Sequence, residues 1–264
     1  MHRSRRQRGI ALILVLWIMV LLTLMAAGFA FERRTDAVLA IDQIEAIEAD
    51  ALAEAAIARA VLALKQDDVE LQPIPDGRIY PWRYAGRELR FAVVSENGKI
   101  DLNGAREELI HGLFSSLVGE LEDFDQAQAD ALADAVLDWR DRDSDTRPSG
   151  AEDDDYRAAG YEYESADAPF VTIGELLRIK GMTEPVYSRV SDAVTVYTRS
   201  GQIDPLSAPR RALLAVPDTE AGLADKVIEA RNARQSVLEP IPELRSWFGD
   251  GARFLTTGRP QTFS

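Results

Sequence analysis

Residues 10–31, IALILVLWIMVLLTLMAAGFAF, decide how this chain begins. They contain no charged side chain and no proline. As a helix they extend about 33 Å, which is enough to cross the hydrocarbon core of a bilayer. Four arginines precede them, at positions 3, 5, 6 and 8, and this one-sided positive charge predicts a cytoplasmic N-terminus. The sequence therefore predicts a transmembrane segment over 10–31, with the remaining chain on the far side of the membrane.

Three kinds of N-terminal segment share this composition. A secretory signal peptide has a shorter apolar core, of about 7–15 residues, with small residues at the cleavage site after it. A plain membrane anchor fits the length and keeps its arginines. In the third kind the cleavage site precedes the apolar segment. Here Arg8 and Gly9 lead directly into Ile10, which resembles the leader junction of type IV prepilins and pseudopilins.

One position departs from the usual pseudopilin pattern. In most such proteins the fifth mature residue is a glutamate, whose carboxylate pairs with the N-terminal amine of a neighbouring subunit. Counted from Ile10, the fifth residue here is Leu14. A subunit without that carboxylate suits the end of a fibre better than a repeating position. Its absence is characteristic of one minor pseudopilin family of type II secretion, general secretion pathway protein K.

Composition limits the chemistry that the chain can perform. The 264 residues carry a formal charge of −14, with no cysteine and two histidines. Removal of the four leader arginines makes the charge −18, so gathering nucleic acid by counterion release is disfavoured. Disulfides and thiolate sites are excluded, and a histidine-based metal or catalytic site is improbable. Calcium bound by carboxylates is the remaining candidate for stabilising an exported domain.

A single long helix is predicted over 10–66. This stretch contains no proline, and apolar residues recur at helical spacing in its second half. We expect that half to pack its apolar stripe on a folded head. A coiled-coil stalk is the alternative, although sustained heptads are missing. Prolines and an Asp-Gly pair between 73 and 81 are expected to end the helix in turns, and residues 87–94 are expected to form a strand.

A short repeat divides the rest of the chain. Gly98-Lys-Ile-Asp is echoed by Gly201-Gln-Ile-Asp, and each copy has an alanine four residues after its aspartate. The copies resemble exit and re-entry points around an inserted domain, after which the second copy returns to the sheet. Helical patterns occupy the stretch between them. The predicted organisation is a leader at 1–9, a helix at 10–66, a pilin-like α/β head at 67–103 and 199–264, and an inserted helical domain at 104–198.

This layout resembles the general secretion pathway protein K family along nearly the full chain. The implied fold class is α+β: a long N-terminal transmembrane helix packed on a pilin-like antiparallel sheet, with a large all-helical domain inserted. The resemblance also implies cleavage between Gly9 and Ile10 by a prepilin peptidase, with methylation of the new amine on Ile10.

An acidic loop follows the helical pattern that ends near residue 140. Asp141, Asp143, Asp145 and Glu152 occupy the first, third, fifth and twelfth positions of an EF-hand loop. Thr146 replaces the usual glycine and Pro148 the usual apolar residue, so an ordinary EF-hand is doubtful. A solvated acidic loop is the alternative. The family is known to bind calcium in its helical insertion, and its motif is present at 138–143 and 150–153. Calcium is therefore expected, with candidate ligands Asp141, Asp143, Asp145, Glu152, Asp153 and Asp154.

A second pattern, from Thr172 to Thr183, resembles a helix-hairpin-helix. It opens with a capping-box spacing, Thr172 to Glu175, and has a glycine at position 181 where the first helix should stop. DNA-binding versions offer backbone N–H groups to a phosphate, but the surrounding domain is acidic. We interpret the hairpin as a packing unit. No nucleophile motif or catalytic arrangement stands out elsewhere.

The resemblance implies a non-enzymatic minor pseudopilin at the tip of a periplasmic fibre, helping to start fibre assembly for export of folded proteins. Its expected location is the inner membrane, single-pass, with the bulk periplasmic. Its expected partners are the minor pseudopilins of the I and J types, the major pseudopilin helix bundle and the prepilin peptidase, and no nucleic acid. One alternative is a membrane-anchored periplasmic calcium-binding receptor outside any fibre, and another is a DNA-uptake protein.

Overall fold

The structure is a computed structural model that describes residues 8–237, 239–257 and 262–264. Most of the predicted leader, residues 1–7, lies outside the described residues. The chain divides into two compact units, one up to Arg59 and one from Ala60 to Ser264, which are described separately.

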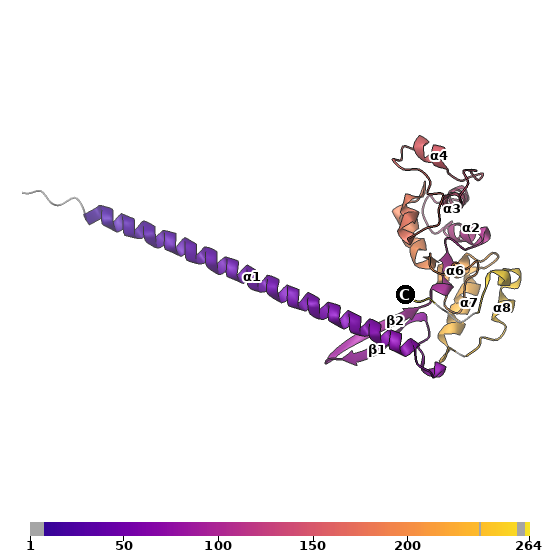
Figure 1. The fold of residues 1–264 in the computed structure, drawn as a ribbon, viewed down its shortest axis with the longest axis horizontal. Coiled ribbons are helices and arrows are strands. Elements are labelled where there is room, and N and C mark those ends of the chain that lie inside the picture. Colours follow the sequence, from indigo (N-terminus) through magenta and orange to yellow (C-terminus); the bar gives the residue numbers. More distant parts are fainter. Residues whose placement is uncertain (1–7, 238, 258–261) are drawn as a thin grey trace, which may run out of the picture. The chain divides into compact units, whose positions relative to one another are not determined.

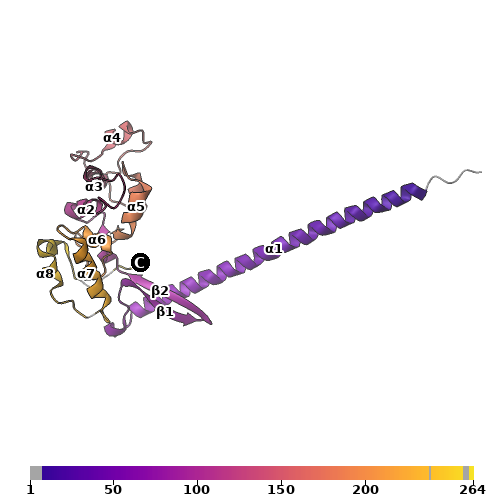
Figure 2. The same cartoon turned by 180° about the vertical axis from the view of Figure 1, so that it is seen from behind.

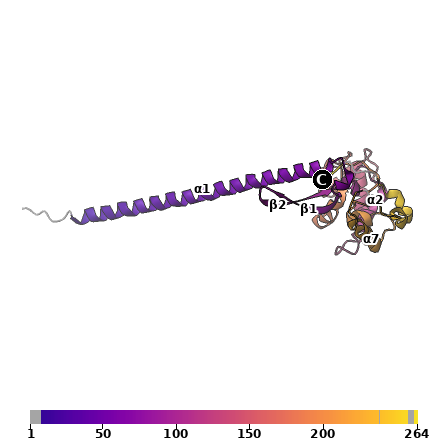
Figure 3. The ribbon, with the colours of Figure 1, turned by 90° about the horizontal axis from the view of Figure 1, so that it is seen from below.

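The described residues of the first unit lie in one helix. Helix α1 runs unbroken from Arg8 to Leu64, 57 residues, close to the predicted range of 10–66. The helix is continuous in Figure 3, and its segment Ala11–Phe29 is long and apolar enough to cross a membrane. The absence of proline explains the continuity, since a proline inside a helix removes a hydrogen bond and clashes with the preceding turn.

The second unit contains the last turn of α1 and, after it, a β-hairpin (Figure 1). Strands β1 (Asp76–Tyr84) and β2 (Arg87–Val94) pair antiparallel around a two-residue turn, Ala85-Gly86. Both turn residues have positive φ, as the preferred hairpin turns require. β2 is the predicted strand. The prediction of turns up to residue 81 was wrong, because Pro81 lies inside β1, where an edge strand tolerates a proline.

The chain reaches this hairpin again at its last described residues. Ser264 exchanges two backbone hydrogen bonds with Val94, of 3.0 and 2.9 Å, and Phe263 forms a bridge with Ser95. The second copy of the repeat does not return to the hairpin as predicted. Its Ile203 forms a bridge with Leu255 instead.

The two copies of the repeat pack against each other. A side chain at Gly98 would clash with the backbone of Ser207, and one at Gly104 would lie 2.5 Å from the carbonyl carbon of Arg199. Strands β3 (Ile100–Asp101) and β4 (Val194–Thr195) pair in parallel at this point. The buried Asp101 accepts hydrogen bonds from the backbone N–H groups of Thr198 and Arg199, both 2.8 Å. The two ends of the predicted insertion are thus fastened together.

The segment between those ends is helical, as predicted. It contains α2 (Glu107–Ser115), α3 (Gln126–Arg140), α4 (Asp153–Ala158) and α5 (Glu184–Val190), with 3₁₀ turns η3 (Ile173–Arg178) and η4 (Ser191–Ala193). After it come α6 (Arg210–Leu214), α7 (Ala221–Asn232), α8 (Leu244–Trp247) and the 3₁₀ turn η5 (Gly249–Phe254). Shorter 3₁₀ turns flank the hairpin, η1 (Val69–Leu71) and η2 (Glu96–Gly98).

One continuous apolar core joins these helices. Helices α2 and α3 pack against each other, and α6 contacts both α2 and α7 (Figure 2). Fully buried members include Leu109, Phe114, Trp139, Leu213 and Phe254. The long N-terminal helix, the small antiparallel sheet and the helical region together confirm the predicted α+β class.

Candidate metal centre

The acidic loop, residues 141–152, connects the end of helix α3 to the start of helix α4. Helix α3 starts at a capping box in which the Asp125 carboxylate accepts from the N–H of Gln128 at 2.9 Å, and it ends at Arg140. Helix α4 starts directly after Glu152. Its first turn carries three aspartates, which the positive end of the helix dipole stabilises. The sequence between the two helices therefore places its carboxylates around a common loop.

Arg147 neutralises the first half of this loop. Its Nη1 donates to Asp138 Oδ1 at 2.7 Å and to Asp141 Oδ2 at 2.6 Å. The fully buried Asp138 also accepts from the N–H of Ala151 at 2.9 Å. Burial raises the pKa of Asp138, against the opposing effect of those hydrogen bonds. Gly150 is required here, because a side chain at that position would clash with the Asp138 carboxylate.

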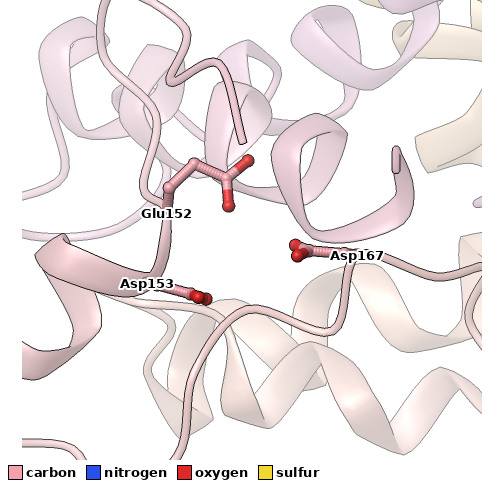
Figure 4. Close-up of side chains that lie close together, drawn as sticks. All are labelled: Glu152, Asp153 and Asp167. Atoms are coloured by element: carbon pink, nitrogen blue, oxygen red, sulfur yellow. The ribbon is translucent and has the colours of Figure 1, made fainter. Parts of the chain in front are cut away.

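Three carboxylates lie close together at the start of α4. Glu152, Asp153 and Asp167 each have an oxygen within 4.8 Å of the others, and among the described residues they form the group that could hold a metal (Figure 4). Glu152 is 4% exposed, and neither of its carboxylate oxygens has a hydrogen-bond partner in the described structure. Asp167 Oδ1 is likewise buried without a partner. Asp153 Oδ1 accepts from the N–H of Ser165 at 3.1 Å.

The charge balance at Glu152 is unfavourable for an ionised carboxylate. Burial, followed by the negative charges of Asp167, Asp138, Asp141 and Asp153, raises the pKa of Glu152 to about 7. A hydrogen-bonded partner would normally offset such burial, because leaving buried acceptors unpaired is costly. A divalent cation would supply that compensation. Carboxylate oxygens are the ligands that calcium prefers, so these residues fit calcium.

Two of the six predicted ligands, Glu152 and Asp153, lie in this group. Asp141 is adjacent: its Oδ1 is buried and unpartnered within the described residues, and its charge acts on Glu152. Asp143 and Asp145 lie outside the group, and Asp143 Oδ1 accepts from the Asp145 N–H at 3.1 Å. Asp154 is 96% exposed and pairs with Arg157. The EF-hand spacing is therefore not reproduced as a single cluster.

Asp167 was not among the predicted ligands, because it lies outside the repeating acidic pattern. An aromatic cluster brings it to the group. Trp139 packs against Tyr156 and Phe170, with ring centroids 5.8 and 6.4 Å apart, and the Trp139 carbonyl accepts from the N–H of Ala168 at 3.3 Å. These contacts fold the loop 159–170 back over α4.

The hairpin around Gly181 uses its polar groups within the domain. The N–H of Lys180 donates to the Tyr156 hydroxyl at 3.1 Å, and the N–H of Met182 donates to the Ile179 carbonyl at 3.0 Å. Gly181 has positive φ and faces Leu132 of α3. As predicted, the Glu175 carboxylate accepts from the N–H of Thr172 at 2.9 Å. This geometry favours the interpretation as a packing unit.

The chain resembles known proteins along most of its length. A family model described as type II secretion system (T2SS), protein K matches residues 92–199. Type II secretion system protein K of Pseudomonas aeruginosa is 26% identical over 86% of this chain and 73% of its own length. The protein of the same name in Klebsiella pneumoniae is 27% identical over 80% of this chain and 70% of its own length.

A solved structure also has this fold. It is the crystal structure of the GspK–GspI–GspJ complex from the enterotoxigenic Escherichia coli type 2 secretion system. One chain matches with a TM-score of 0.56 and 18% identity, over 83% of this chain and 82% of its own length. Together with the sequence matches, these findings confirm the predicted resemblance to the type II secretion system protein K family.

Proposed function

We propose that this minor pseudopilin caps the periplasmic fibre of a type II secretion system and helps to start its assembly. The observation that carries the proposal is α1, which continues without a break from an apolar segment long enough to span a membrane to the start of the head. Such a helix can first lie in the inner membrane and then pack its apolar surface against sister helices.

The N-terminal sequence supports processing as a pseudopilin. Gly9 and Ile10 lie at the start of α1, immediately before the apolar segment. A prepilin peptidase that cuts between them leaves the whole apolar helix on the mature protein. Methylation of Ile10 then follows on the new amine. The four arginines before the cut hold the N-terminus in the cytoplasm, so the head is periplasmic.

Two features support the tip position. The fifth mature residue, Leu14, has no carboxylate to neutralise a neighbour's amine. The insertion between residues 104 and 198 also adds several helices to a small hairpin head, and this bulk obstructs a subunit above it. The related solved structure is of a complex with GspI and GspJ. We therefore infer that the I- and J-type minor pseudopilins are partners, and that the major pseudopilin bundle lies beneath them.

We assign a structural calcium ion to Glu152, Asp153 and Asp167. Its role is to cancel the repulsion between buried carboxylates and so to fasten α4 and the loop 159–170 to α3. The chain then acts by assembly and not by catalysis.

The processing of the N-terminus distinguishes the proposed pseudopilin from the alternative, a membrane-anchored receptor that never enters a fibre. Intact mass measurement of the protein from membranes should show loss of residues 1–9 and one added methyl group. Replacing Gly9 by a bulky residue should leave the unprocessed form in the membrane. A wild-type protein that retains its leader would favour the plain membrane-anchored receptor.

A further inference from the structure

The β-hairpin has one backbone edge that is only partly covered. The alternation of bonded and unbonded pairs in an antiparallel ladder shows which edge. Tyr84 and Arg87 flank the two-residue turn, so they exchange hydrogen bonds with each other. The next bonded pairs are Trp82 with Leu89 and Tyr80 with Phe91. Glu88 and Arg90 alternate with these bonded residues, and Ala92 follows Phe91. The backbone N–H and C=O groups of these three residues therefore point away from β1.

The last described residues confirm that alternate residues of β2 point their backbone groups outward. Val94 is two residues beyond Ala92 on β2, and its outward N–H and C=O bond to Ser264 at 3.0 and 2.9 Å. A short third strand thus covers the β2 edge at Val94 and Glu96, where the Glu96 N–H donates to the Thr262 carbonyl at 3.0 Å. From Ala92 to Glu88, no backbone partner lies on that edge among the described residues.

The opposite edge of the hairpin is protected. By the same alternation, Ile79, Pro81 and Arg83 of β1 point their backbone groups outward. Pro81 has no N–H to offer, and it interrupts the row at its middle. Proline on an edge is a common protection against strand addition. The hairpin therefore accepts an added strand on the β2 side and resists one on the β1 side.

Charge indicates which strand would fit. Residues 76–94 carry four arginines against Asp76 and Glu88, a net charge of +2. By contrast, residues 104–198 hold 22 acidic and 8 basic side chains, which accounts for the whole net charge of −14. The hairpin is thus a basic element in an acidic chain. A second copy paired edge to edge would place two hairpins of charge +2 side by side, which disfavours self-pairing.

We propose that the β2 edge from Glu88 to Ala92 binds an extended acidic segment of a neighbouring pseudopilin, which adds antiparallel or parallel to β2. Backbone hydrogen bonds hold such a segment, and side chains opposite Arg90 give it specificity. The proposal rests on the proposed function, because it assumes that another fibre subunit supplies the segment.

Hydrogen exchange tests this on the full-length protein in detergent, alone and co-purified with the I- and J-type subunits of the same organism. In the complex, the amides of Glu88, Arg90 and Ala92 should exchange at least about tenfold more slowly, while those of Ile79 and Arg83 on the opposite edge stay unchanged. A complex that forms without this protection overturns the strand addition and leaves the proposed function intact. Failure of any complex to form contradicts the proposed function itself. A concentration-dependent dimer of the chain alone, protected at 88–92, would show self-pairing and overturn the proposal.

A matched pair of variants tests the same edge. Arg90→Pro and Arg83→Pro each remove one arginine and one outward N–H, on opposite edges of the hairpin. Arg90→Pro should weaken partner binding by about tenfold or more, because a partner carbonyl is left unpaired. Arg83→Pro should change it less than about twofold. Equal losses of affinity in both variants would contradict the assignment. Arg90→Ala removes the charge but keeps the backbone N–H, so it measures the contribution of the charge alone. If Arg90→Pro unfolds, the exchange measurement still decides.

Discussion

Replacement of Glu152 by glutamine should stabilise the calcium-free protein and remove its response to calcium. In the native state the pKa of Glu152 is raised from its usual 4.5 to about 7 by burial and by neighbouring carboxylates. The native state therefore holds this proton more tightly than the unfolded chain does. As the pH rises from 4.5 to 7 the calcium-free wild type loses stability, and the full cost is present above pH 7.

The magnitude follows from the size of that shift. At about 1.4 kcal/mol per pKa unit, the cost is about 3 kcal/mol, reduced to the extent that solvent screens the neighbouring charges. For a head of this size it corresponds to a melting temperature higher by up to about 6–12 °C in the calcium-free variant at pH 8. At pH 4 the two proteins should melt together, because the wild-type carboxyl is then protonated in both states.

Thermal unfolding of the full-length protein in detergent, followed by circular dichroism, measures these differences. Chelator should lower the melting temperature of the wild type at pH 8 and leave that of Glu152→Gln unchanged. Asp154→Asn is the matched control, because this neighbouring acid is 96% exposed and its loss should shift stability by less than about 0.5 kcal/mol. A calcium-free Glu152→Gln protein that is less stable than the wild type at pH 8, and is still stabilised by calcium, would refute the reasoning.

Three further predictions follow from the same structure. Gly150→Ala should lower the free energy of unfolding by about 2–4 kcal/mol, because the new methyl group meets the Asp138 carboxylate; an unchanged denaturant midpoint would contradict this. Terbium added to the calcium-free protein should show luminescence sensitised by Trp139, displaced by calcium and absent in Asp167→Asn, whereas equal emission from that variant would remove Asp167 from the site. Leu14→Glu should leave fibre assembly nearly unchanged when pseudopili are counted in cells, and a large increase would show that the missing carboxylate alone excludes this subunit from the shaft.

The main helices and one strand could be predicted because their signals are local. Helix α1 follows from 22 uncharged residues and the absence of proline, and β2 from an apolar run before Asn97-Gly98. Strand β1 could not be found in this way. Its Pro81 and its Asp-Gly pair indicate turns locally. Its pairing depends on the turn at Ala85-Gly86, which places Pro81 where no ladder N–H is needed.

The carboxylates of the candidate metal centre were predicted in part for the same reason. Glu152 and Asp153 belong to a dense acidic pattern that sequence spacing detects. Asp167 comes to them through the packing of Trp139 with Tyr156 and Phe170, a tertiary contact with no sequence period. The spacing of Asp141, Asp143 and Asp145 suggested an EF-hand. Arg147 instead pairs with Asp138 and Asp141, and no pattern rule includes such an internal cation.

The proposed position of this chain at the tip of the fibre can be measured in isolated pseudopili. Gold labelling of a tagged, functional full-length protein in electron micrographs gives the number and position of its copies. We expect one labelled position per fibre, at one end. Label repeated along the shaft, or filaments built from this chain alone, would contradict it.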